Sequence, residues 1–528
     1  MNTHDRNDDA ALLFPAAGMV DQGQFEAVSS SAYHPQEYVS PALPQELIDQ
    51  ILEIIVRCQH QQPNSKGNGA VGRCMLVSRS FLTSIRRYLF ESITIRDTRK
   101  AATFGALPPS ETARMEGLLR IFRNDPLHDT AYPLVAHVRS VKMVMESADS
   151  ISKTNTLLNK ASKDSSSAIL DWNSRRVSMR EVLRAVKHLE RFSLGFSSPI
   201  SGYSMHVGIS LAIEKACKSS LLTQLEFSNI FHFPVDLLAE CMNLRHLILL
   251  NVSTGESEDD IGPATKRKSY APTLLPAIWG RKSLQILEIL DTENSGDVLE
   301  EIRSLSAPKP SRSMCFSQIK TFKLGLPTKA GLDNYREVEI MRHAASTLES
   351  LTIRGITGDI SFNVCPGRLC LSDLKSLRSL HLDLTFSSIS LFGQIPLCLD
   401  ALLGEQLHSP TTIETIGFDV VVKVAHFNSK FSTLKLEMDP AWATIDHHLT
   451  NGAQFPVLRK VTFNLLIFHH QLLPSPFLPR PESWEEVNQL KTGLLAGFNG
   501  LTDKLFQAVA QSQRIKYDFN VDFTETWI

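Results

Sequence analysis

Apolar residues recur along most of this chain at positions i, i+3 and i+5. Ten such trios are Val138/Val141/Met143, Leu189/Phe192/Leu194, Leu222/Leu225/Phe227, Leu244/Leu247/Leu249, Leu284/Leu287/Ile289, Ile319/Phe322/Leu324, Leu348/Leu351/Ile353, Leu377/Leu380/Leu382, Ile413/Ile416/Phe418 and Leu458/Val461/Phe463. The last two positions of each trio have the period of a β-strand that buries one face. Phe90, Ile93 and Ile95 have the same spacing, and residues 517–523 alternate apolar and polar as an edge strand does. The pattern therefore predicts strands from residue 90 to the C-terminal region.

Helical patterns lie between these strands, for example at Val338, Met341 and Ala345. A strand and helix repeated this often are typical of a leucine-rich-repeat solenoid, whose strands line one concave face. The first positions of successive trios are separated by 22 residues (222 to 244) up to 51 residues (138 to 189). The standard unit has roughly 20 to 29 residues, so we expect an irregular repeat. An ordinary α/β domain with parallel strands gives the same alternation and stays open as the alternative.

Polar stretches interrupt the pattern. Residues 1–40 have no periodicity and are expected to be disordered, and the stretches near 146–178 and 255–272 are expected to be surface insertions. This leaves residues 98–528 for the repeat domain.

Residues 41–97 have a different pattern, which predicts two short helices. Pro44 suits the first turn of a helix. The apolar positions that follow are Leu47, Ile48, Ile51, Leu52 and Ile55, which share one helix face. A second apolar face includes Met75, Leu76, Val77, Phe81, Ile85, Tyr88 and Leu89.

These residues resemble the F-box family in three pieces that occur in the family's order. The pieces are Leu43-Pro44-Gln45-Glu46-Leu47-Ile48, Ile51-Leu52 and Leu76-Val77-Ser78-Arg79-Ser80-Phe81. Residues 86–93 look like the tail common in fungal F-box proteins. Residues 57–73 separate the two halves by more than the family's usual connection. A plain helical hairpin is the alternative for this unit.

The resemblance implies a substrate-recognition subunit of a Skp–cullin–F-box ubiquitin ligase. Such a protein docks a Skp-type adaptor, and through it a cullin, and holds a protein substrate with its C-terminal domain. Catalysis then belongs to other subunits, so the chain is expected not to be an enzyme. The adaptor-binding residues carried over are Leu43, Pro44, Leu47, Ile48, Ile51, Leu76, Val77 and Phe81. A leucine-rich-repeat scaffold without a ubiquitin-ligase role is the alternative.

The expected substrate surface is the concave strand face, between the buried positions of the trios. Polar candidates there are Arg245, His246, Glu288, Lys323, Arg354 and His381.

Composition agrees with a globular protein that binds neither nucleic acid nor membrane. Of 528 residues, 43% are hydrophobic and 21% charged, and the net charge is −2. Eight cysteines and an acidic N-terminus without a signal-peptide pattern predict a cytoplasmic or nuclear protein. No apolar run reaches the eighteen or so residues of a membrane span.

Catalytic and metal motifs are weak. Gly67, Gly69 and Gly72 match the dinucleotide-binding spacing, but a polar stretch precedes them where the mechanism needs a buried strand. An α/β enzyme that uses this loop is the third alternative. Cys365 and Cys370 lack a second ligand pair at zinc spacing, so no metal or cofactor is expected.

Overall fold

The computed structural model describes part of the 528-residue chain. The described residues are 47, 50–51, 90–96, 111–123, 134–145, 177–201, 207–239, 241, 243–254, 284–290, 298, 316–325, 335–357, 371–386, 402–403, 410–424, 441–471, 492 and 506–527. The chain divides into two compact units, Met1–Pro63 and Asn64–Ile528, and each is described by itself.

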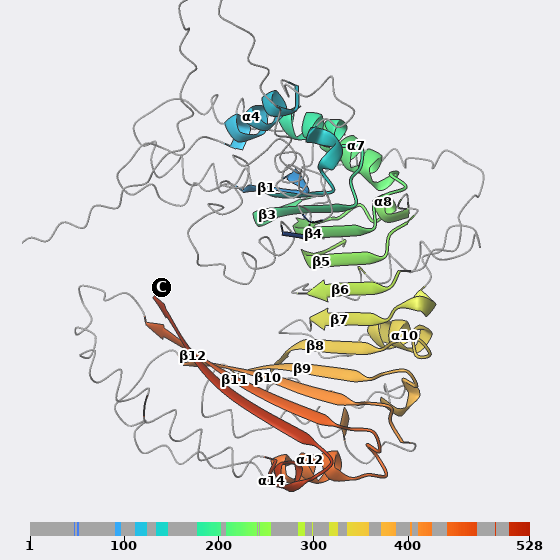
Figure 1. Cartoon of the computed structure of the whole chain (residues 1–528), viewed down its shortest axis with the longest axis vertical. Coiled ribbons are helices and arrows are strands. Elements are labelled where there is room, and N and C mark those ends of the chain that lie inside the picture. The colour runs from blue at the N-terminus through green and yellow to red at the C-terminus, as the bar shows by residue number, and fades with distance from the viewer. Residues whose placement is uncertain are drawn as a thin grey trace, which may run out of the picture. The chain divides into compact units, whose positions relative to one another are not determined.

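Twelve strands in the second unit form one parallel sheet. They are β1 (Ser92–Arg96), β2 (Ser140–Met145), β3 (Arg191–Ser201), β4 (Gln224–Phe231), β5 (His246–Val252), β6 (Ile286–Leu290), β7 (Thr321–Gly325), β8 (Ser350–Thr357), β9 (Ser379–Phe386), β10 (Thr415–Val424), β11 (Lys460–Gln471) and β12 (Lys516–Trp527). Each strand pairs with its neighbours in the sequence, so the order runs from β1 to β12 without a reversal (Figure 1). The described strands therefore have no topological switch point, which is where open α/β sheets bind nucleotides.

Short helices lie on the connections between strands. They include α4 (Glu111–Arg123), α7 (Val207–Cys217), α8 (Asp236–Ala239), α10 (Tyr335–His343), α12 (Ala441–Thr450) and α14 (Gln507–Gln511), with 3-10 turns η1 (Leu134–His137), η4 (Phe316–Gln318) and η5 (Leu371–Asp373). The prediction of a mixed α/β fold is confirmed, and the predicted edge strand at residues 517–523 is part of β12.

The trios explain why the strands form and how they align. No side chain in the ten trios is more than 4% exposed. The middle position of each trio faces the middle position of the next, as Leu351 faces Leu380 and Leu380 faces Ile416. Because a slip of one residue would move a whole strand's apolar side chains to the other face, the trios also fix the register.

The helices pack on the apolar side of the sheet and complete one continuous core. In α4, Met115, Leu119 and Phe122 are buried at helical spacing, whereas Arg120 and Arg123 are exposed. This is the amphipathic pattern of a helix that covers a core.

Aromatic rings close the core at its C-terminal end, where α12 and α14 lie side by side (Figure 1). The Phe506 ring centroid lies 5.6 Å from those of Phe418 and Trp442 and 5.8 Å from that of Phe463. Phe463 also stacks on Phe519 of β12 at 5.4 Å. These contacts join three consecutive strands to the two helices beneath them.

Several predictions fall on residues that the structure does not describe. They are the disorder of residues 1–40, most of the insertion near 146–178, the insertion at 255–272, and nearly all of both helices in residues 41–97. Among the described helices, none combines the length and apolar character that a membrane crossing requires.

Candidate functional site

The side of the sheet opposite the core carries polar side chains and is the candidate binding surface. We call it the polar face and define it by Lys142, Glu226, His246, Glu288, Lys323, Arg354, His381, Asp383, Asp419, Asn464, Asp518 and Asn520. These residues lie on β2 and on β4 to β12. They alternate with the buried positions of each strand, because successive side chains of a strand point to opposite faces.

A charged cluster occupies the middle of the polar face. His246 Nε2 and Lys323 Nζ lie 3.2 and 2.9 Å from the same oxygen, Glu288 Oε1. The hydrogen bond with His246 lowers the pKa of the Glu288 carboxyl, and the Lys323 contact adds to it, although partial burial opposes both. Glu288 is therefore held as an anion between two cation-forming groups from the strands on either side.

A second cluster crosses four strands, from β9 to β12. His381 Nε2 lies 2.7 Å from Asp419 Oδ2, and Asn464 Nδ2 donates to Asp419 Oδ1 at 2.7 Å. Asn520 Nδ2 in turn donates to Asn464 Oδ1 at 2.8 Å. The hydrogen bond with His381 is the main cause that lowers the pKa of Asp419.

Gly417 makes room for the imidazole of this cluster. A Cβ atom at Gly417 would clash with His381 Nδ1, so the ring occupies the space that any other side chain would fill. Absence of a side chain on β10 thus allows His381 on β9 to reach Asp419.

Two more ion pairs lie on the polar face, one before the first cluster and one between the two clusters. Lys142 Nζ on β2 lies 2.9 Å from Glu226 Oε1 on β4, which spans the intervening strand β3. Arg354 Nε lies 3.8 Å from Asp383 Oδ2. The polar face therefore presents charges of both signs, whose partners come from different strands.

Most of the predicted substrate-face residues lie in these clusters. The structure brings His246, Glu288 and Lys323 together, and it places Arg354 and His381 in neighbouring pairs. Arg245 lies instead at the turn before β5.

The sequence reasoning did not single out Asp419, Asn464 or Asn520. Asp419 and Asn464 directly follow the last residue of their trios, as Arg354 does, so aligning the trios would have found them.

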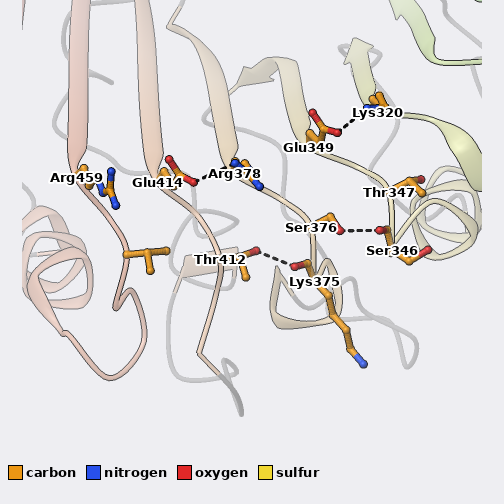
Figure 2. Close-up of a pocket in the computed structure, with 11 residues that line it drawn as sticks. Lys320, Ser346, Thr347, Glu349, Lys375, Ser376, Arg378, Thr412, Glu414 and Arg459 are labelled. Atoms are coloured by element: carbon orange, nitrogen blue, oxygen red, sulfur yellow. Dashed lines mark hydrogen bonds and ion pairs between the residues drawn. The ribbon is translucent and has the colours of Figure 1, made fainter.

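A second surface lies at the amino ends of β7 to β11, where the residue before each strand is charged or polar (Figure 2). We call it the edge groove; it has a volume of about 490 Å³. Its charged residues are Lys320, Glu349, Lys375, Arg378, Glu414 and Arg459.

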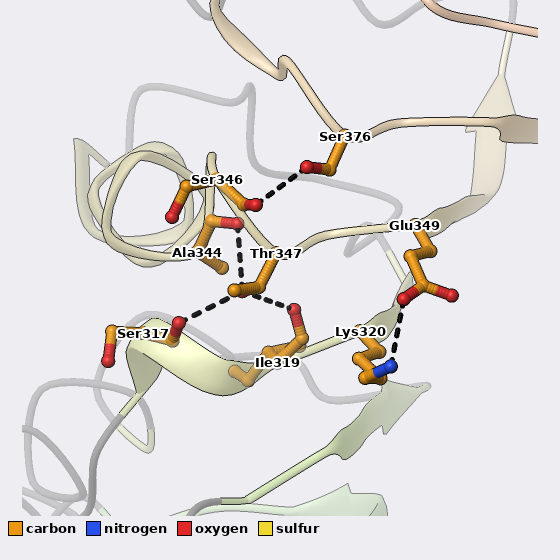
Figure 3. Close-up of polar contacts among 8 residues, drawn as sticks. All are labelled: Ser317, Ile319, Lys320, Ala344, Ser346, Thr347, Glu349 and Ser376. Atoms are coloured by element: carbon orange, nitrogen blue, oxygen red, sulfur yellow. Dashed lines mark hydrogen bonds and ion pairs between the residues drawn. The ribbon is translucent and has the colours of Figure 1, made fainter.

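Hydroxyl groups form hydrogen bonds between consecutive turns beneath the edge groove (Figure 3). Thr347 Oγ1 lies 2.9 and 3.0 Å from the carbonyl oxygens of Ser317 and Ile319, and Ser376 Oγ donates to the Ser346 carbonyl at 2.6 Å. Thr412 Oγ1 makes the matching contact with the Leu377 carbonyl at 2.9 Å. These hydrogen bonds connect each turn to the preceding turn, and they stabilise the backbone beneath the groove.

Two of the predicted adaptor-binding residues are described. Leu47 and Ile51 are helical, four residues apart, and 44% and 40% exposed. Residues at this spacing lie on one helix face. The others, Leu43, Pro44, Ile48, Leu76, Val77 and Phe81, lie outside the described residues.

Other candidate chemistry from the sequence gains no support. The glycine-rich loop at 67–72, Cys365 and Cys370 lie outside the described residues. Within the described ranges, no three His, Cys, Asp or Glu side chains gather as a metal site would require.

Comparison with known proteins gives no relative: no protein-family model matches this chain, and no curated protein sequence matches it.

Proposed function

We propose that this protein is a substrate-recognition subunit of a Skp–cullin–F-box ubiquitin ligase. Residues 41–97 dock the Skp-type adaptor, and the sheet holds a protein substrate. The protein itself performs no chemistry, because ubiquitin transfer belongs to other subunits of the ligase.

One observation supports the proposal that residues 41–97 bind the Skp-type adaptor. Leu47 and Ile51 expose large apolar side chains on one face of a helix. Burying such a side chain is worth about 1.5 to 3 kcal/mol, so an exposed pair at helical spacing favours a partner that covers it. Recognition of an apolar helix face by a groove is a common way to bind such a segment. The Leu-Pro-x-Glu-Leu/Ile resemblance includes Leu47.

The arrangement of the strands supports the second part of the proposal, which concerns the repeat domain. We infer that residues 98–528 form an irregular leucine-rich-repeat-like solenoid, because the strands are parallel and follow the sequence order, with one apolar trio on most of them. Stacked repeats contact mainly their neighbours, which produces this order. Solenoids use extended strand faces to bind partners, so the substrate surface is the polar face.

The test is a pull-down of the full chain with a recombinant Skp adaptor. Leu47→Asp/Ile51→Asp and Leu43→Ala/Pro44→Ala should each abolish capture, because central apolar anchors contribute most of an interface's binding energy. Ile121→Asp is the matched control: Ile121 is 47% exposed on α4, so this change should leave capture intact.

Capture that is lost in both anchor variants, with unchanged circular dichroism, supports the receptor. If the folded wild type does not bind the adaptor, the receptor function is wrong, and the scaffold without a ligase role is the better description.

A further inference from the structure

The edge groove has cations that no carboxylate of the described chain neutralises. Its lining holds four cationic and two anionic side chains, so its net charge is +2. Lys320 pairs with Glu349 at 2.9 Å and Arg378 with Glu414 at 3.6 Å. In the part of the chain that the structure describes, Lys375 and Arg459 have no such pair, and both side chains are exposed (Figure 2).

Several neutral hydrogen-bond donors of the groove are already used. The main-chain N–H groups of Glu349, Arg378, Glu414 and Arg459 each donate to the carbonyl of the preceding turn, at 2.8 to 2.9 Å. The hydroxyls of Thr347, Ser376 and Thr412 face carbonyl oxygens in the same way. The charged donors that remain for a ligand are ammonium and guanidinium groups, which favour an anionic partner.

We propose that the edge groove binds an extended acidic peptide segment of another protein. Arg378 precedes β9 and Arg459 precedes β11, with β10 between them. Neighbouring strands lie about 4.8 Å apart, so the two residues are separated by roughly 10 Å along the edge. A peptide in the polyproline II conformation repeats its side-chain direction every three residues, or about 9 Å. Acidic side chains three residues apart on such a peptide match the spacing of Arg378 and Arg459. Arg378 is exposed and its pair with Glu414 is long, at 3.6 Å, so it can contact the peptide as well.

Fluorescence polarisation with a labelled twelve-residue peptide tests this proposal. The peptide carries glutamate at every third position with proline and alanine between, and its counterpart carries lysine at the same positions. The wild-type full chain should bind the glutamate peptide and not the lysine peptide. Because the groove is open to solvent, added salt should weaken this binding.

Reversing the charge of groove residues tests whether the glutamate peptide binds in the edge groove. Lys375→Glu/Arg459→Glu should weaken binding of the glutamate peptide by about tenfold or more. Arg120→Glu/Arg123→Glu, on exposed positions of α4, makes the same change in net charge and should alter binding less than about twofold. If the reversed variant does not fold, Lys375→Ala/Arg459→Ala replaces it and should weaken binding in the same direction.

The proposal is overturned if the wild type does not bind the glutamate peptide, or if the α4 pair weakens binding as much as the groove pair. Because the adaptor is absent from this assay, its outcome is independent of the receptor function proposed above.

Discussion

Replacing Asp446 with alanine should loosen the C-terminal end of the sheet while leaving the rest intact. Asp446 lies on α12 and is 6% exposed. Its carboxylate oxygens accept hydrogen bonds from the main-chain N–H groups of Ala508 and Val509, at 2.6 and 2.9 Å. These N–H groups lie in the first turn of α14, where a helix leaves its donors without internal partners. Phe506 at the N-cap supplies no side-chain acceptor, so Asp446 caps this helix from 62 residues away.

The magnitude follows from the burial of the two donors. A hydrogen bond to a charged group contributes about 1.5 to 3 kcal/mol, and a buried donor left without a partner costs a similar amount. The Val509 bond is buried, whereas the Ala508 bond is partly buried, so water can replace part of the second. We therefore expect the alanine variant to lose about 2 to 4 kcal/mol of local stability. Asparagine keeps one acceptor oxygen and should lose roughly half as much.

Hydrogen exchange measures this loss where it occurs. A local loss of about 2 to 4 kcal/mol speeds exchange roughly 30- to 1,000-fold, since about 1.4 kcal/mol is a factor of ten. The Val509 amide and the amides of β12 should show this change, because β12 packs on α14. Amides of β2 to β4 should be unaffected, since regions that do not share contacts open separately.

Asp373→Ala is the control, because Asp373 is exposed on η5. If Asp446→Ala leaves exchange at Val509 within about threefold of the wild type, the carboxylate does not hold α14 and the reasoning fails.

Two further predictions concern the His381–Asp419 cluster. Gly417→Ala should push the His381 ring off Asp419 and cost at most about 1 kcal/mol, since the pair is partly exposed. Gly117→Ala on α4, which meets no atom within 4 Å, should instead raise stability by about 0.5 to 1 kcal/mol; denaturant unfolding of both variants checks the difference in sign. Because the pKa of Asp419 is lowered in the folded state, its contribution is present above the unfolded value of about 3.9 and disappears as pH falls through the lowered folded value. Asp419→Asn should therefore flatten the acid limb of a stability-against-pH curve, and an unchanged slope would contradict the assignment.

The sequence by itself determined the strands. Each trio predicts which residues are buried, because a strand with period two points its last two trio positions to one face and the residue between them to the other. All twelve strands fall where this spacing or the alternation at 517–523 predicted them. The mixed α/β class follows from the helical patterns between trios, and the polar positions of β5 to β9 opposite the core follow from the alternation within each strand.

Only the tertiary structure decided which polar residues meet. His381 and Asp419 are 38 residues apart, Lys142 and Glu226 are 84 apart, and Asp446 and Val509 are 63 apart. The connections between trios vary in length from one strand to the next, so distance along the chain does not indicate which side chains become neighbours. Register sets those neighbours, and register depends on the buried side chains of all adjacent strands at once. The edge groove arises in the same way, because its charges gather only when the turns before five strands are stacked side by side.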